Sequence, residues 1–445
     1  MRLKKINMKW MLLISYIRSS YWFIPLLMAF FAIVLAVLAT ELDHWLGSQW
    51  ISQSSFFLNS QAEGARAVLA TIAGSMITVA GVTFSMTLVA VSFALGQIGP
   101  RLIRNFMQDK TNQFTLGTFI ATFLYTILVL RTVSNASNAN MGNSFVPHVA
   151  IFIAMLLAIL SITVLIFFIH HIQKCINISE ILGNIGGELI AQLSELSSIE
   201  ETSSSKQYNE TDISAFHNFR DSSNSIISKK NGHIKTINIK SIFKLATEKK
   251  CIIEITFQPG TFVSQTSTLL YVSKILDEDD QKILLDCFSI GPERDQDQDI
   301  YFLSDQISEI IARALSPGVN DPFTAISAIN WLRCAIEALS RIKTIHPYQY
   351  DEKGNLRIIV HPISLTQFVN KVFGQIRAYV SSDFNTALHI MLLIKQMIQN
   401  SKNSTLTQLL HLHAGYFHMA AMENLGLKQD KEVLSKYIAE IIELK

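Results

Sequence analysis

The chain is poor in charge for its length. Only 16% of its 445 residues are Asp, Glu, Lys or Arg, whereas a soluble domain usually carries about 25%. The net charge of +2 and the absence of a basic patch exclude a nucleic-acid partner from our expectations. The four cysteines stand singly without a CxxC pair, so neither a zinc site nor a disulfide framework is predicted.

Catalytic motifs are also missing. No GxSxG, Walker or Rossmann fingerprint occurs in the sequence. His411 and His418 can share a helix face, but His413 points elsewhere and no HExxH arrangement exists. We therefore expect no enzyme, no catalytic residue, no metal site and no cofactor.

Long apolar runs dominate the first part of the chain. There are four of them: Tyr21 to Thr40, Ala67 to Leu95, Leu116 to Val133, and Pro147 to Ile169. A helix needs about 20 residues to cross the hydrocarbon core of a bilayer. None of the runs contains Asp or Glu, and Arg131 lies near the end of the third run. The sequence predicts a membrane domain of four transmembrane helices in residues 21–171.

Basic residues flank these runs on one side only. They gather in residues 1–20, in the connection around Arg101 and Arg104, and after the fourth run. The segment 41–64 is acidic, and 134–144 is uncharged. The positive-inside rule then predicts that both termini are cytoplasmic. A cleaved signal peptide is the alternative for the first run, but its basic region and its length favour an uncleaved helix.

The second run carries small and hydroxyl residues at helical spacing. These are Gly74, Thr78, Gly81, Ser85 and Ser92. Steps of three, four and seven place them on one helix face. That face can serve close helix packing in the bilayer, or it can line a hydrated path. Both hold if the helix packs around the axis of an oligomer.

The end of this run predicts a cytoplasmic mouth. Gln97, Arg101 and Arg104 surround a Gly-Pro pair that should end or kink the helix. The two arginines satisfy the positive-inside rule, and as a ring they would also attract anions. No Asp, Glu or His lies near a midplane, which disfavours a proton-coupled carrier.

Two runs of sequence resemble a known family. One extends from Phe84 through Ser92 to Pro100-Arg101-Leu102 and Gln113, and the other is Ala312-Arg313-Ala314-Leu315-Ser316-Pro317-Gly318-Val319-Asn320-Asp321-Pro322. They are similar to a bacterial membrane-protein family catalogued as domain of unknown function 2254. The resemblance implies a bacterial inner (plasma) membrane location and a helical membrane domain with a cytosolic tail. It brings no activity or ligand.

The remaining chain reads as an α+β cytoplasmic domain. Residues 172–232 predict a juxtamembrane helix, weakened by Gly183, Gly186 and Gly187, and then a flexible loop. Alternating apolar residues in 233–290 predict strands, and a Pro-Gly spacing there is similar to small β-barrels. Amphipathic patterns in 291–445 predict a helical bundle.

A helix connector in this domain offers a second candidate site. Ser316-Pro317-Gly318 ends one predicted helix, and Asp321 before Pro322 begins the next. Helix capping explains this pattern. Alternatively, Arg313, Asn320 and Asp321 bind a polar ligand or a neighbouring subunit.

Two functions follow from these patterns. The first is a homo-oligomeric pore or channel for small ions or solutes, with the second transmembrane helix lining the path. The alternative is a membrane-anchored sensor or scaffold whose cytoplasmic domain binds a soluble protein. The expected partners are the lipid bilayer and further copies of the chain.

Overall fold

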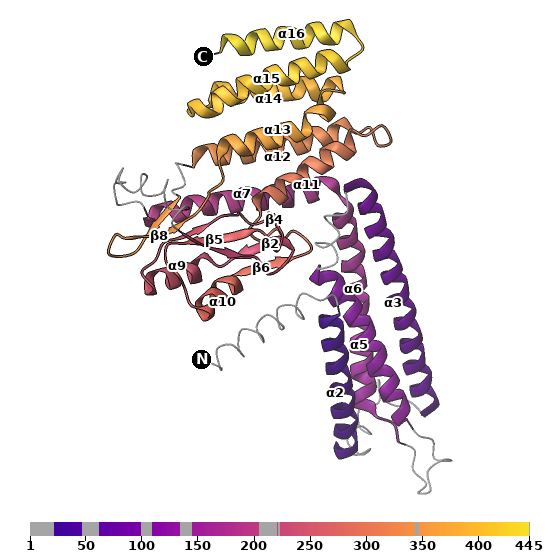
Figure 1. The fold of residues 1–445 in the computed structure, drawn as a ribbon. Coiled ribbons are helices and arrows are strands. Elements are labelled where there is room, and N and C mark those ends of the chain that lie inside the picture. The colour runs from indigo at the N-terminus through magenta and orange to yellow at the C-terminus, as the bar shows by residue number, and fades with distance from the viewer. Residues whose placement is uncertain are drawn as a thin grey trace. The chain divides into compact units, whose positions relative to one another are not determined.

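The computed structural model describes residues 22–46, 62–98, 109–133, 145–203, 220, 223–342 and 347–444. The chain forms two compact units, Met1–Asn177 and Ile178–Lys445. We call them the membrane unit and the C-terminal unit. Figure 1 colours the first indigo to magenta and the second magenta to yellow.

The described part of the membrane unit contains four long helices. They are α2 (Phe23–Leu46), α3 (Ala62–Ile98), α5 (Lys110–Thr132) and α6 (His148–Ile176). All four are long and apolar enough to cross a membrane, as predicted from the apolar runs. With 37 residues, α3 is about 55 Å long, so it exceeds the roughly 30 Å hydrocarbon core and must tilt or project.

Helix α5 forms the centre of the membrane unit. It packs against α2, α3 and α6. Half of its most apolar segment is buried, compared with 22–33% of the corresponding segment in each of the other three helices. Gly117 makes the contact with α2 possible, because a Cβ there would lie 2.6 Å from Met28 Sδ and 3.2 Å from Pro25 Cα. A small residue is therefore required where α5 meets α2.

Polar contacts tie one end of this unit together. The buried Asp43 carboxylate at the end of α2 accepts hydrogen bonds of 2.9 Å from the backbone amides of Val149 and Ala150. It thereby caps the N-terminus of α6, where free amides favour an anion. Tyr125 of α5 donates to the Ala150 carbonyl at 3.0 Å. Three helices meet at these few atoms.

The C-terminal unit begins with α7 (Ile178–Ser203). This helix packs against α11 (Ile300–Ala314) and α12 (Pro322–Arg341). A Cβ on Gly186 would overlap the indole ring of Trp331 in α12. Gly186, one of the cluster expected to weaken the helix, thus lets an aromatic ring pack directly on the α7 backbone.

The described residues of this unit include eight strands, which form two sheets. They are β1 (Asn224–Ile227), β2 (Gly232–Ile237), β3 (Ile253–Ile255), β4 (Phe262–Val263), β5 (Thr268–Val272), β6 (Phe288–Gly291), β7 (Tyr348–Tyr350) and β8 (Leu356–Ile359). The larger sheet has the order β1-β5-β3-β8-β7, and the smaller has β4-β2-β6. Pairing is antiparallel except between β3 and β8.

The described strands form two sheets and no closed barrel, so the small β-barrel predicted for residues 233–290 is not confirmed. Ile253 and Leu270 of the larger sheet share one apolar core with Ile234 and Val263 of the smaller sheet. Helices α9 (Ile239–Glu248) and α10 (Glu278–Asp286) lie between strands in sequence. Strand β1 comes from the segment predicted as a loop, and β7 and β8 come from the segment predicted as helical. Their long-range pairing extends the larger sheet beyond the predicted boundaries.

The remaining helices pack consecutively (Figure 1). After α11 and α12 come α13 (Leu365–Val380), α14 (Phe384–Asn400), α15 (Ser404–Asn424) and α16 (Lys428–Glu443). Short polar side chains begin several of them: Asp299, Asp321, Asp383 and Asn403 each accept a backbone hydrogen bond from the first turn. This capping marks helix starts that the sequence shows directly.

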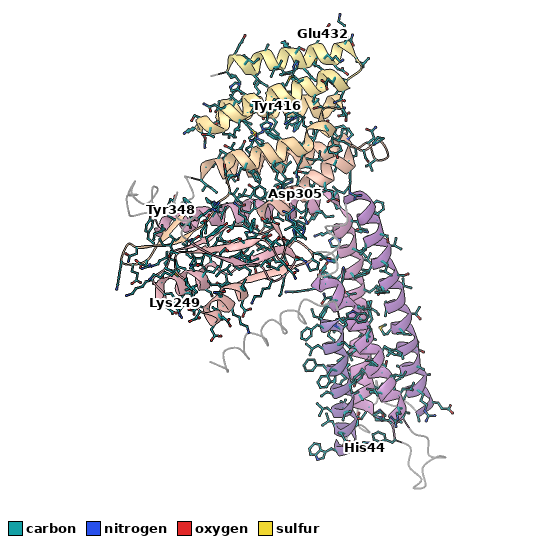
Figure 2. The ribbon with its side chains drawn as sticks, viewed as in Figure 1. His44, Lys249, Asp305, Tyr348, Tyr416 and Glu432 are labelled. Atoms are coloured by element: carbon teal, nitrogen blue, oxygen red, sulfur yellow. The ribbon has the colours of Figure 1, made fainter. Side chains whose placement is uncertain are left out.

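A buried carboxylate links α11 to α13. Asp305 accepts hydrogen bonds from Arg294 at 2.6 Å, Lys371 at 2.5 Å and Gln375 at 3.0 Å, and Figure 2 labels it within the packed helices. Burial acts to raise the pKa of Asp305, but these hydrogen bonds outweigh it and lower the pKa below its ordinary value. These hydrogen bonds stabilise the ionised carboxylate of Asp305 inside the C-terminal unit.

Candidate functional site

One face of α3 carries the residues singled out in the sequence. We call Gly74, Thr78, Gly81, Ser85 and Ser92 the small-residue face. All five are exposed in the single chain. A Cβ added at Gly74 or Gly81 would meet nothing within 4 Å. Within the described part of the chain, this face therefore has no packing partner.

A different face of α3 holds it against the other helices. Its buried residues are Ala65, Leu69, Ala73, Met76, Ala80, Thr83, Thr87, Ala90 and Val91. At 100° per residue, the centre of this row lies roughly 150° around the helix from the small-residue face. Packing inside one chain accounts for the buried row and leaves the small-residue face unexplained.

The hydroxyl groups on the small-residue face differ in their hydrogen bonding. Thr78 Oγ1 donates to the Gly74 carbonyl at 2.8 Å, which is how Thr side chains commonly satisfy themselves in membrane helices. Among the described residues, Ser85 and Ser92 have no side-chain hydrogen bond. These hydroxyls are available to water, to an ion or to another helix.

The predicted cytoplasmic mouth lies largely outside the described residues. Gln97 belongs to the last turn of α3. Arg101 and Arg104 fall in the segment 99–108, which the structure does not describe. The basic ring stays a prediction from the sequence.

The connector between α11 and α12 is a capped helix start. Asp321 accepts hydrogen bonds from the Thr324 amide at 3.1 Å and the Thr324 hydroxyl at 2.6 Å. The hydroxyl bond is the main reason that the pKa of Asp321 lies below its ordinary value. Arg313 instead contacts Glu309 at 3.4 Å, and Asn320 adopts a left-handed backbone with φ of 48°. No described hydrogen bond or ion pair joins these three predicted site residues to one another.

Sequence reasoning missed the polar groups at the ends of the membrane unit. Asp43 looked like a loop residue because it follows the apolar run, yet α2 continues past it to Leu46. At the other end, Asp109 caps α5 and shares a hydrogen bond with the His171 ring of α6. Asn112, one turn into α5, is 3% exposed, and its side-chain atoms have no partner among the described residues. Asp43 lies within one turn of the first apolar run, which was an available signal, whereas Asp109 lies about two turns before the third run and gave none.

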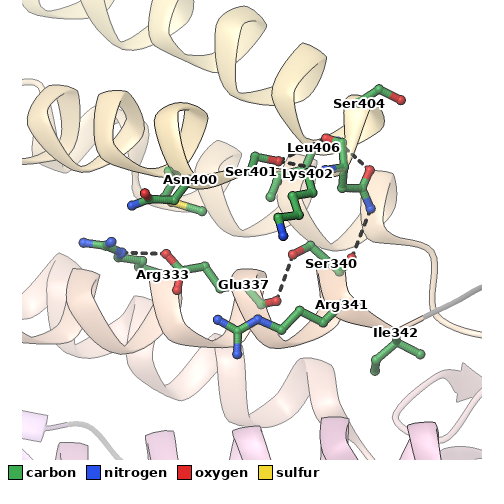
Figure 3. A pocket seen from close by; sticks show the side chains of 12 residues that line it. Arg333, Glu337, Ser340, Arg341, Ile342, Asn400, Ser401, Lys402, Ser404 and Leu406 are labelled. Atoms are coloured by element: carbon green, nitrogen blue, oxygen red, sulfur yellow. Dashed lines mark hydrogen bonds and ion pairs between the residues drawn. The ribbon is translucent and has the colours of Figure 1, made fainter.

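The C-terminal unit adds a cavity that no motif predicted. It has a volume of about 830 Å³ and lies where α12 and α14 end and α15 begins. Arg333, Arg341 and Lys402 bring positive charge to its wall, and Glu337 brings negative charge (Figure 3). Arg333, Glu337 and Arg341 come from α12, whereas Lys402 lies in the distant connection between α14 and α15, so the sequence did not show that they line one cavity.

Relatives of the chain include proteins of mycobacteria. An uncharacterized protein of Mycobacterium bovis is 28% identical over 342 residues, which is 76% of this chain and 64% of the relative. An uncharacterized protein of Mycobacterium tuberculosis shows the same identity and coverage. The alignments thus span less than two thirds of these relatives.

No solved structure matches the chain. Residues 18–396 match a family described as "Predicted membrane protein (DUF2254)", the one suggested by the two motif runs. This match includes the four membrane helices and most of the C-terminal unit. The chain therefore belongs to this family of membrane proteins.

Proposed function

We propose that the protein is a homo-oligomeric pore for small ions or solutes. In this assembly, the small-residue faces of α3 from several copies surround a common axis. The observation that carries the proposal is the exposure of this face on the side of α3 away from its own bundle. We further propose a bacterial inner-membrane location with both termini cytoplasmic, which the basic flanks favour.

The length of the face suits a path across a membrane. From Gly74 to Ser92 the helix rises about 27 Å, close to the roughly 30 Å hydrocarbon core. Small residues allow close approach of helix backbones, which drives association in lipid where the hydrophobic effect between helices is absent. The same residues leave space at an axis, and the hydroxyls of Ser85 and Ser92 can replace some of the hydration of a permeating solute.

The chemistry of the face favours passive movement. It carries no ionisable side chain, so it offers no proton relay of the kind that pumps use. Arg101 and Arg104 near its predicted inner end would favour anions over cations at that entrance. We therefore expect conduction without coupling to protons.

Flux through reconstituted protein tests the proposal. Ser85→Trp places a large ring on the small-residue face, and Met86→Trp places the same ring about 100° away on an exposed flank. We expect Ser85→Trp to reduce ion flux into liposomes at least tenfold and Met86→Trp to change it less than twofold. Panels of anions and cations identify the permeant class.

Oligomeric state is measured on the same samples by mass photometry in detergent. A monomer without flux would overturn the proposal. If the Ser85→Trp oligomer conducts as well as the unsubstituted protein, α3 does not line the path.

A membrane-anchored scaffold is the second candidate. Phe323 is 75% exposed and Val319 is 38% exposed, on either side of Asn320 and Asp321. Exposed apolar side chains beside a rigid helix cap suit contact with a soluble protein. Copurification of a stoichiometric partner that is lost with Phe323→Ser, together with absence of flux, would favour this function.

A further inference from the structure

The lining of the cavity in the C-terminal unit carries a net positive charge. Arg333, Arg341 and Lys402 against Glu337 leave two net positive charges on the wall. The C-terminal ends of α12 and α14 and the N-terminus of α15 contribute about half a charge each, two negative and one positive. These partial charges do not cancel the side chains, so the cavity stays positive.

The three cationic side chains differ in their ion pairs and hydrogen bonds. Arg333 is held by Glu337 at 2.8 Å and by Gln396 at 2.9 Å. Arg341 and Lys402 are exposed and form no ion pair among the described residues. Figure 3 shows Lys402 reaching from the α14–α15 connection toward α12, where Arg341 extends from the last turn.

Backbone amides at the start of α15 add hydrogen-bond donors to those of the side chains. Asn403 caps α15 through a 3.1 Å bond from the Leu406 amide, and it also donates to the Ser340 carbonyl at 3.1 Å, which fixes the helix start against α12. The amide of Ser404, at the first position of α15, has no acceptor among the described residues. Amides at a helix start, an arginine fork and a lysine together are the donors that bind phosphate groups.

We propose that this cavity binds a small molecule through its phosphate group. The volume of about 830 Å³ lies within the range of small-ligand sites, roughly 300–1,000 Å³. The apolar side chains of Ile342, Met397 and Leu406 line the same cavity and can contact the rest of the ligand. The proposal does not depend on whether the membrane unit conducts.

Calorimetric titration of the purified full-length protein tests the site. The probes are AMP and inorganic phosphate at low ionic strength, where screening is weak. We expect both to bind, phosphate to compete with AMP, and the double variant Arg341→Gln/Lys402→Gln to weaken AMP binding at least tenfold. The control Lys229→Gln/Lys240→Gln removes the same charge from exposed positions outside the cavity lining and should keep the affinity within twofold.

A lipid arm separates the two sources of phosphate. Nanodiscs with and without phosphatidic acid are titrated in the same way. Binding of phosphatidic acid alone, lost in the Arg341→Gln/Lys402→Gln variant, keeps the phosphate site and assigns a lipid headgroup to it. Absence of binding by all three probes overturns the proposal, as does AMP binding that the two double variants weaken equally. Equal thermal midpoints of the variants verify that these surface changes leave the fold intact.

Discussion

Helices α5 and α3 both carry rows of small and hydroxyl residues, but the row that includes Thr122 on α5 is buried in its own chain, whereas the small-residue face of α3 is exposed. Thr122 of α5 is buried and lies 3.0 Å from the Ser161 hydroxyl of α6. Thr78 and Ser85 of α3 are exposed. Residues of similar composition thus pack inside the bundle on α5 and remain exposed on α3. Pairs of matched substitutions can break or sharpen this comparison.

The largest difference is expected for two glycines. Gly117→Leu puts a side chain against Pro25 and Met28, and the backbone of Pro25 cannot move away without shifting α2. Overpacking of this kind typically costs about 1–3 kcal/mol, and the fixed Pro25 backbone places Gly117→Leu at the upper end of that range. Gly81→Leu meets open space, so the free energy of unfolding of the single chain should stay within about 0.5 kcal/mol.

Unfolding by SDS, followed by circular dichroism, measures both variants. Gly81→Leu should also disrupt the proposed oligomer. Equal destabilisation by the two leucines would mean that α3 and α5 do not differ in the way described. An intact oligomer with Gly81→Leu would place the subunit contact elsewhere.

The sequence predicted the parts of the fold that depend on local patterns. Long runs without acidic residues defined the four membrane helices, and Asp321 before Pro322 defined the start of α12. It could not predict contacts between distant segments. Pairing of β3 with β8 joins residues about 100 positions apart, so nothing in residues 233–290 distinguished two sheets from a barrel.

The same distinction between local patterns and contacts of distant segments applies to the candidate site. Spacing alone places the five small residues on one face of α3, since a helix fixes that geometry. It could not tell which face α3 buries, because that depends on Met76 and Ala80 meeting α5 and α6. The cavity beside Arg341 was missed because its lining combines α12 with the distant α14–α15 connection that carries Lys402.

Two histidines of α15 extend the comparison to the C-terminal unit. His413 is 2% exposed, and its Nε2 lies 2.8 Å from Asn370 Oδ1. Burial, and then the nearby Arg377, lower the pKa of His413 to about 4. Because the unfolded chain takes up the proton near pH 6.5 and the folded chain does not, stability is full above pH 6.5 and falls as the pH drops toward 4.

The expected loss is about 3 kcal/mol over this pH range. Urea unfolding followed by Trp331 fluorescence, with the other tryptophans replaced by Phe, measures it in the full chain. His413→Gln should flatten the pH dependence by that amount, whereas His411→Gln, at a half-buried position two residues earlier, should leave it in place. A pH dependence unaffected by His413→Gln would assign the titration to another group.

Two acidic residues of α2 give the next smaller difference. Asp43→Ala removes two hydrogen bonds to the amides that begin α6, and loss of such a cap costs about 2 kcal/mol. Glu41 is exposed two residues earlier, so Glu41→Ala should change the free energy of unfolding by less than about 0.5 kcal/mol. The SDS titration compares them. Equal effects would show that net charge at this end matters more than the cap.

The smallest effects on stability are expected for Thr122 and Thr78. This pair should be the most informative, because one substitution should change only stability and the other only ion flux. Thr122→Val removes the hydroxyl contact with Ser161, which is worth about 0.5–1 kcal/mol in a membrane bundle, and should leave ion flux unchanged once the protein has folded. Thr78 bonds only to its own helix, so Thr78→Val should leave the free energy of unfolding unchanged while lowering flux severalfold. If Thr78→Val lowers stability and spares flux, the α3 face packs against protein and lines no path.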